Sequence, residues 1–130
     1  MNMTSLAQSA YAPASAATHT ARDIEYHAFA HVTGRLAEAR DGAAETGGLA
    51  KLAEAMFDNV RLWATLAADC ASDANQLPRE LRAQIIGLAN FARTHMSKVL
   101  AGSETVDALI EINMAIMKGL RGEAGEDGAA

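Results

Sequence analysis

The stretch LAKLAEAMFDNVRLWATLAADCA, residues 49–71, decides the fold class of this chain. Its larger apolar side chains recur every three or four residues, which is the spacing of one face of an α-helix. That stripe consists of Leu49, Leu52, Met56, Val60, Trp63, Ala67 and Cys70. The charged side chains fall mostly on other faces and form both repulsive and attractive pairs, so they add little net stability. This helix therefore has to be held by packing of its apolar stripe against other segments.

Three further segments with the same spacing flank this helix. One is expected to begin at Thr20, whose hydroxyl can cap the amide of Asp23, and to end at the glycine-rich break of residues 41–48. Another begins at Pro78, which suits a first helical position, and ends near Leu100. The last spans residues 104–120. The expected stripe of the first segment is Ile24, Ala28, Val32, Leu36 and Ala39. The stripe of the segment from Pro78 is Leu81, Ile85, Leu88, Ala92, Met96 and Val99. The stripe of the last segment is Val106, Leu109, Ile110, Ile112, Asn113, Ile116, Met117 and Leu120.

These segments predict an all-α fold, a small antiparallel bundle of about four helices around one core. The composition agrees, because 30 of the 130 residues are alanine, the best helix former, and only 10 are valine or isoleucine. Residues 1–19 show no usable period and are expected to form a flexible N-terminal arm. Residues 122–130 are rich in glycine and acidic side chains and are expected to be a disordered tail, which leaves residues 20–121 as the helical domain.

The charge of the chain excludes some classes of partner. Of the formal net charge of −5, the tail contributes −3, and residues 22–121 carry 11 basic and 13 acidic side chains without a run of Lys or Arg. Direct binding to nucleic acid is therefore not expected. No stretch approaches the roughly 18 apolar residues of a membrane span, and the N-terminus lacks the features of a secretory signal. The single Cys70 fits a reducing compartment, so we expect a cytoplasmic location.

Histidines and the one cysteine are the residues from which a metal or catalytic site would be built. His27 and His31 project from one helix face, and Cys70 and His95 could in principle complete a site. Zinc needs three or four ligands, however, and Ala28 occupies the position where the zincin pattern has glutamate. Ordinary, partly exposed histidines are the favoured interpretation. Cys70 lies on an apolar stripe, where burial blunts a thiol, so we expect no metal, no cofactor and no enzyme.

Three side chains each allow a structural and a binding interpretation. Trp63 lies on an apolar stripe, which favours a core anchor, but its large amphipathic ring also suits a binding hot spot. Asn113 interrupts the apolar face of the last helix, where it could lock the register of the helices or recognise a partner. Met114 falls on the more polar side of that helix, and an exposed, flexible methionine suits a peptide-binding surface.

Several blocks of the sequence, taken in order, resemble the FlaF family of bacterial flagellar biosynthesis regulators. They are NVRLW at residues 59–63, NQLPRELR at residues 75–82, and LIEIN at residues 109–113 with GL at residues 119–120. Tyr11 and the RDIE of residues 22–25 resemble the N-terminal pattern of the family, so the resemblance covers roughly residues 11–120. The family tends to have a basic side chain directly after Asn113, where this chain has Met114.

The resemblance implies a cytoplasmic factor needed for flagellin production and export, with flagellin, the regulator FlbT and the flagellar export machinery as partners. The favoured function is an export chaperone or adaptor that receives a flagellin segment as an amphipathic helix in a groove. The alternative is a post-transcriptional regulator of flagellin expression that acts through FlbT without holding flagellin. The sequence leaves the oligomeric state open. The candidate partner-binding residues are Tyr11, Asn59, Leu62, Trp63, Asn113 and Met114.

Overall fold

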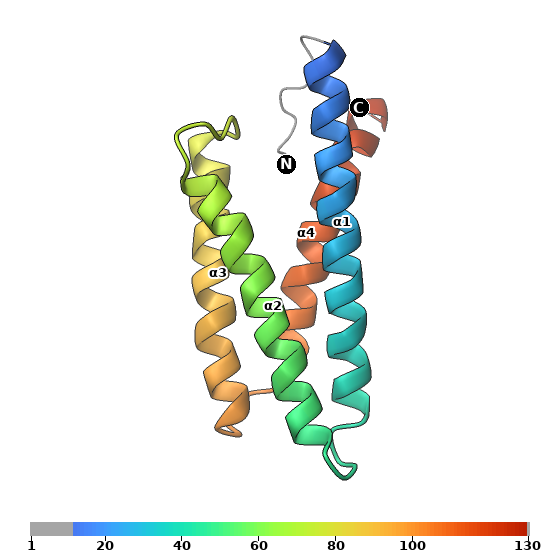
Figure 1. Ribbon diagram of the computed structural model, residues 1–130, viewed down its shortest axis with the longest axis vertical. Helices are drawn as coiled ribbons and strands as arrows, with labels where there is room; N and C mark the ends of the chain where they lie inside the picture. Colours follow the sequence, from blue (N-terminus) through green and yellow to red (C-terminus); the bar gives the residue numbers. More distant parts are fainter. Residues whose placement is uncertain (1–11, 130) are drawn as a thin grey trace.

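The computed structural model describes the backbone of residues 12–129 and the side chains of residues 25–119. Its four helices are α1 (Ala12–Asp41), α2 (Gly48–Ala71), α3 (Arg79–Leu100) and α4 (Asp107–Ala129). Consecutive helices run in opposite directions, as the colour change along the ribbon in Figure 1 shows, and the described residues contain no strand. The predicted all-α bundle of four antiparallel helices is confirmed.

The helices pack as a row of neighbours and not as a closed ring. α1 lies between α2 and α4 and packs closely against both, while α3 packs closely against α2. Contact between α3 and α4 is slight, and Figure 1 shows α2 with α3 as one pair and α1 with α4 as the other. α2 therefore has a side that faces the core and, beside α3, a side that no other helix covers.

The turn between α1 and α2 requires glycine at two neighbouring positions. Gly47 has a φ of 77°, which lies in the left-handed region. Gly48 is buried, and a Cβ atom there would overlap the carbonyl oxygen of Gly42 and would lie 2.6 Å from that of Ala43. The predicted break at residues 41–48 is thus a tight turn in which two parts of the backbone touch.

Glycine and proline also delimit α3. Gly102 has a φ of 82°, its N–H donates to the carbonyl of Val99, and the N–H of Ser103 donates to the carbonyl of Lys98, both at 3.0 Å. This pair of hydrogen bonds is a Schellman motif, which ends the helix. At the other end, the sequence predicted Pro78 as the first helical residue, but the helix begins at Arg79 and Pro78 is its N-cap.

Trp63 of α2 and Phe29 of α1 form the centre of the core. Neither has exposed surface, and their rings meet edge to face with centroids 5.1 Å apart. The other buried apolar residues come from all four helices and the links between them. They are Leu36, Leu52, Ala55, Met56, Leu66, Cys70, Leu77, Ile85, Ala92, Val106 and Leu109. The structure therefore places Trp63 as a core anchor.

The buried face of α1 differs from the predicted stripe by one position. Phe29, Thr33 and Leu36 are buried, whereas Ala28 and Val32 are only half-buried. Both rows have helical spacing, so periodicity alone does not choose between them. The choice is made by the aromatic ring at position 29, because only that row brings it against the core tryptophan.

Two helices extend further than the sequence predicted. α1 begins at Ala12, so the expected cap at Thr20 is wrong and that residue lies within the helix. Residues 12–19 are rich in alanine, and Pro13 stands in the first turn, where a missing N–H removes no helical hydrogen bond. α4 continues past the expected end near Leu120 to Ala129. Residues 1–11 of the predicted arm lie outside the described residues.

Candidate functional site

A buried network of four polar side chains joins three helices. The Nε1–H of Trp63 in α2 donates to Oδ1 of Asn113 in α4 at 2.8 Å. The Nδ2 of Asn113 donates to Oδ1 of Asn59 in α2 at 2.7 Å and to Oγ1 of Thr33 in α1 at 3.0 Å. Thr33 is 7% exposed, and the other three have no exposed surface. Asn113 uses its acceptor oxygen and both amide hydrogens, so its side chain is the centre of the network.

This network fixes the position of α4 along α1 and α2. A slide of α4 by one helical turn, about 5.4 Å, would separate Asn113 from partners that are all buried. The geometry therefore supports the register-locking interpretation of Asn113. The network leaves one buried polar group unpaired, because the Nδ2 of Asn59 has no hydrogen-bond partner among the described residues.

The candidate partner-binding residues do not form one surface. Three of them are the buried members of the network described above. Leu62 is half-buried in a hollow between α1 and α2. Met114 is 56% exposed on α4, beside a second hollow between α1 and α4. Tyr11 lies outside the described residues. The described candidates are thus divided between the core and two separate faces.

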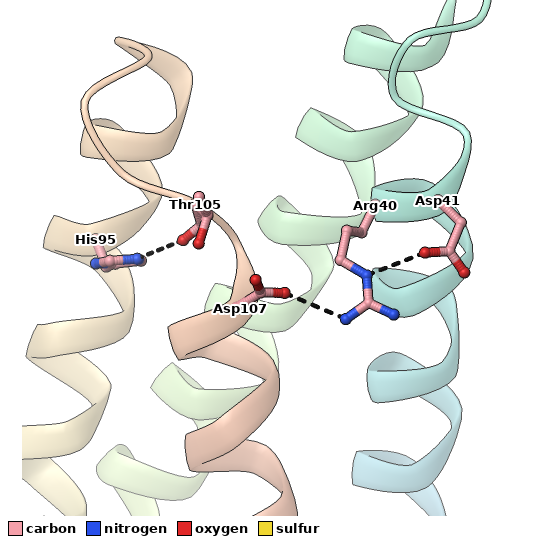
Figure 2. Close-up of polar contacts among 5 residues, drawn as sticks. All are labelled: Arg40, Asp41, His95, Thr105 and Asp107. Carbon is pink, nitrogen blue, oxygen red and sulfur yellow. Dashed lines mark hydrogen bonds and ion pairs between the residues drawn. The ribbon is translucent and has the colours of Figure 1, made fainter.

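An arginine joins α1 and α4 at the end of the bundle where α1 finishes and α4 begins (Figure 2). The Nη1 of Arg40 lies 3.2 Å from Oδ1 of Asp107, and its Nε lies 3.1 Å from Oδ1 of Asp41. The hydrogen bonds to Asp41 and Asp107 raise the pKa of Arg40. A cation at the C-terminal end of α1 and a carboxylate at the N-terminal end of α4 each complement a helix dipole. The pair is exposed, so it orients the two helices more than it stabilises them.

His95 connects α3 to the link that precedes α4. Its Nε2–H donates to the carbonyl oxygen of Thr105 at 2.7 Å, as Figure 2 shows. The ring is 6% exposed and stacks on Phe91 with centroids 5.1 Å apart. His95 therefore has a structural role that the spacing of apolar residues along α3 did not indicate.

The residues considered for a metal or catalytic site lie apart. His27 and His31 are exposed on α1, whereas Cys70 is 1% exposed in α2 and His95 is engaged as described. Burial, with a smaller contribution from Asp69, raises the pKa of the Cys70 thiol to about 11, which keeps the thiol protonated at neutral pH. Within the described part of the chain, no three His, Cys, Asp or Glu side chains are placed to hold a metal ion.

A second apolar row runs along α2 on the side next to α3. Its members fall at helical spacing, with Ala67 and Ala68 side by side, and none carries a charge. Three of them, Leu49, Val60 and Ala67, were predicted to face the core. Leu49 and Phe57 are 60% and 56% exposed. α2 is thus apolar over more of its circumference than the core requires. We call this row the outer face of α2. It consists of Leu49, Ala53, Phe57, Val60, Ala64, Ala67, Ala68 and Ala71.

Beside α3 the outer face of α2 is hollowed into a shallow trough of about 300 Å³. Most of its lining side chains are small and apolar, so a partner helix could approach the two helices closely. The lining residues are Val60, Ala64, Ala67, Ala68 and Ala71 of α2 with Ile86, Ala89, Asn90 and Arg93 of α3. The sequence contained a signal for this surface. From position 64 onward every residue of the row is alanine, whereas the solvent-facing side of an ordinary helix carries charged residues.

Comparison with protein-family models gives a match over most of the chain. The family model described as Flagellar protein FlaF matches residues 7–120, which includes every sequence block quoted above. No curated protein and no solved structure matches the chain. Across the residues that the structure describes, each helix is too short or too polar to span a lipid bilayer.

Proposed function

The chain belongs to the FlaF family of flagellar proteins, and on that premise we propose that it supports flagellin synthesis and secretion by binding flagellin as an export chaperone or adaptor. A filament subunit has to be kept from polymerising before it is exported. A chaperone can do this by covering an apolar segment of the subunit and delivering the covered subunit to the export machinery. The role requires a binding surface and no catalytic step.

The outer face of α2 is the observation that carries this proposal. It presents an uninterrupted apolar row about as long as the helix itself, and α3 borders it to form a trough. An amphipathic helix laid into such a trough buries its own apolar face, which is a recurrent way of recognising peptides. Phe57 and Leu49, both more than half exposed, supply the larger side chains that such a helix would cover.

The binding of purified flagellin monomers to the full chain tests the proposal. Calorimetry and light scattering after gel filtration should show a one-to-one complex, and the chain should delay polymerisation of flagellin at equal molar ratio. Phe57→Glu, which puts a charge on the outer face without touching the core, should weaken both effects. Lys51→Glu is the control on the same helix, because Lys51 is exposed, lies outside the outer face and is not a candidate partner-binding residue.

The same experiment, repeated with FlbT, separates the chaperone from the regulator. Binding of flagellin in the absence of FlbT supports the chaperone. Binding to FlbT alone, with no complex and no delay of polymerisation when only flagellin is present, would contradict the proposal and favour a post-transcriptional regulator that acts through FlbT.

A further inference from the structure

We infer that the trough between α2 and α3 selects a partner helix with acidic side chains along the edge that faces α3. This inference rests on the proposed function for the identity of the partner as a segment of flagellin. The chemistry of the partner, however, follows from the charges around the trough.

Arginines border the α3 side of the trough. Arg82, Ile86, Ala89 and Arg93 are spaced by four, three and four residues, so they share one face of α3. Ile86, Ala89 and Arg93 line the trough, and Arg82 lies one turn before Ile86. The apolar floor thus has one cation, Arg93, in its lining, and Arg82 continues the same face of α3 about three turns away.

Neither arginine is neutralised by the part of the chain that the structure describes. The Nε of Arg82 is buried without a hydrogen-bond partner among the described residues. Arg93 donates from Nη2 to the neutral Oδ1 of Asn90 at 3.1 Å. No described carboxylate forms an ion pair with either guanidinium, so the exposed charge of Arg93 is available to a bound molecule and the half-buried Arg82 adds a second positive charge on the same face of α3.

The carboxylates of α2 lie on a different side of the helix. Asp58 forms an ion pair with Arg35 of α1, and Glu54 lies 3.8 Å from the same guanidinium. Asp69 accepts a hydrogen bond from Asn75 in the turn after α2. The outer face of α2 itself has no charged residue, so it brings no negative charge to the trough that Arg93 lines.

This arrangement argues against a second copy of the chain as the occupant. Two copies packed through this face would each bring apolar residues and the same two arginines, with no carboxylate from the outer face to meet them. A helix with glutamate or aspartate beside its apolar stripe instead pairs with both cations while its stripe covers the floor.

Two designed peptides provide the probe. Both carry the same stripe of alanine and leucine, and one has glutamate where the other has lysine along one edge of the stripe. Titrated into the isotope-labelled full chain at low salt, the glutamate peptide should bind about tenfold more tightly than the lysine peptide. The amide signals that shift should belong to the outer face of α2 and to Ile86 and Ala89 of α3.

Charge reversal on α3 then tests the two arginines. Arg93→Glu alone, and Arg82→Glu with Arg93→Glu, should reduce or reverse the preference for the glutamate peptide and should weaken binding of flagellin about tenfold in the double variant. Lys98→Glu is the matched control, since it makes the same change on another face of α3 and should leave the preference unchanged. Far-UV circular dichroism confirms that each variant folds, and Arg93→Glu keeps the test valid if the half-buried Arg82 does not tolerate glutamate.

The outcomes separate this inference from the proposed function. Equal affinity for the two peptides, shifts confined to α1 and α4, or a dimer that Ala64→Glu dissociates would overturn the inference. Binding of flagellin that no α3 variant alters would also overturn it while leaving the chaperone function intact. Discrimination between the peptides without any binding of flagellin would sustain the inference about the trough and refute the proposed partner.

Discussion

The side chain of Asn113 holds three helices together, so Asn113→Ala is the most informative perturbation of this fold. The substitution removes hydrogen bonds to Trp63, Asn59 and Thr33. Trp63 and Asn59 have no exposed surface through which water could replace the lost partner. Each buried polar group left without a hydrogen-bond partner costs about 1–3 kcal/mol, so the groups of Trp63 and Asn59 together cost about 2–6 kcal/mol.

The third partner adds less to this estimate. Thr33 keeps a contact from its Oγ1 to the sulfur of Met117 at 3.8 Å, and a hydroxyl can rotate toward a new acceptor. The space left by the amide adds a cavity contribution. We therefore expect Asn113→Ala to lower the free energy of unfolding by about 4 kcal/mol. Urea unfolding, followed by the fluorescence of the single tryptophan and by far-UV circular dichroism, measures this change.

Two further variants make the result interpretable. Asn90→Ala makes the same chemical change at an exposed position, where the amide accepts one hydrogen bond from Arg93, and should change stability by less than about 0.5 kcal/mol. Asn59→Ala should cost less than Asn113→Ala, because Asn59 makes one hydrogen bond in the network and its Nδ2 has no described partner. A loss below about 1 kcal/mol for Asn113→Ala, at an unchanged slope against urea, would refute the view that this network is dry and holds α4 in register.

The remaining expectations concern four single positions. Gly48→Ala should lower the free energy of unfolding by about 1–3 kcal/mol, because the new Cβ would overlap a backbone oxygen. Gly34 lies at an exposed helix position with open space around it, so Gly34→Ala should raise the free energy of unfolding by about 0.5–1 kcal/mol in the same urea assay. Folding raises the pKa of the Cys70 thiol from 9.0 to about 11. The stability that the protonated thiol contributes should therefore be complete below pH 9 and be lost as the pH rises toward 11. Urea midpoints measured across that pH range, with Cys70→Ala as the control, test this loss of stability. Arg40→Ala should leave the urea midpoint almost unchanged, because its ion pair with Asp107 is exposed, and a shift as large as that of Asn113→Ala would contradict this.

The positions of the helices could be predicted because each apolar period is long and its breaks are chemically distinct. The turn after α1 contains Gly47 and Gly48, and α3 is bounded by Pro78 and Gly102, so local chemistry sets these limits. The outer ends of α1 and α4 were not predicted. Beyond Thr20 and Leu120 the apolar period ceases, although the backbone remains helical.

The faces of the helices were less predictable, because side chains distant in the sequence decide them. Phe29 is buried and Val32 is not, since the core tryptophan accepts the ring of Phe29. Trp63 and Asn113 are 50 positions apart, and nothing local to either residue shows that they bond. His95 is likewise buried by a contact with a backbone carbonyl beyond the end of its helix. These contacts depend on which helices are neighbours, and periodicity carries no information about that.

The network and the trough divide α2 between two tasks. Asn59 and Trp63 face α1 and α4 and hold the bundle together, while Phe57 and Ala64 are exposed on the side of the same helix next to α3. A sequence selected for stability alone would place charged or polar residues at these outer positions, because an exposed apolar row gives no burial and favours association. The row continues along the whole of α2, and Arg93, which lines the trough beside it, forms no ion pair with a described carboxylate. We therefore expect variants on the outer face to alter binding without altering stability, and variants in the network to alter stability first.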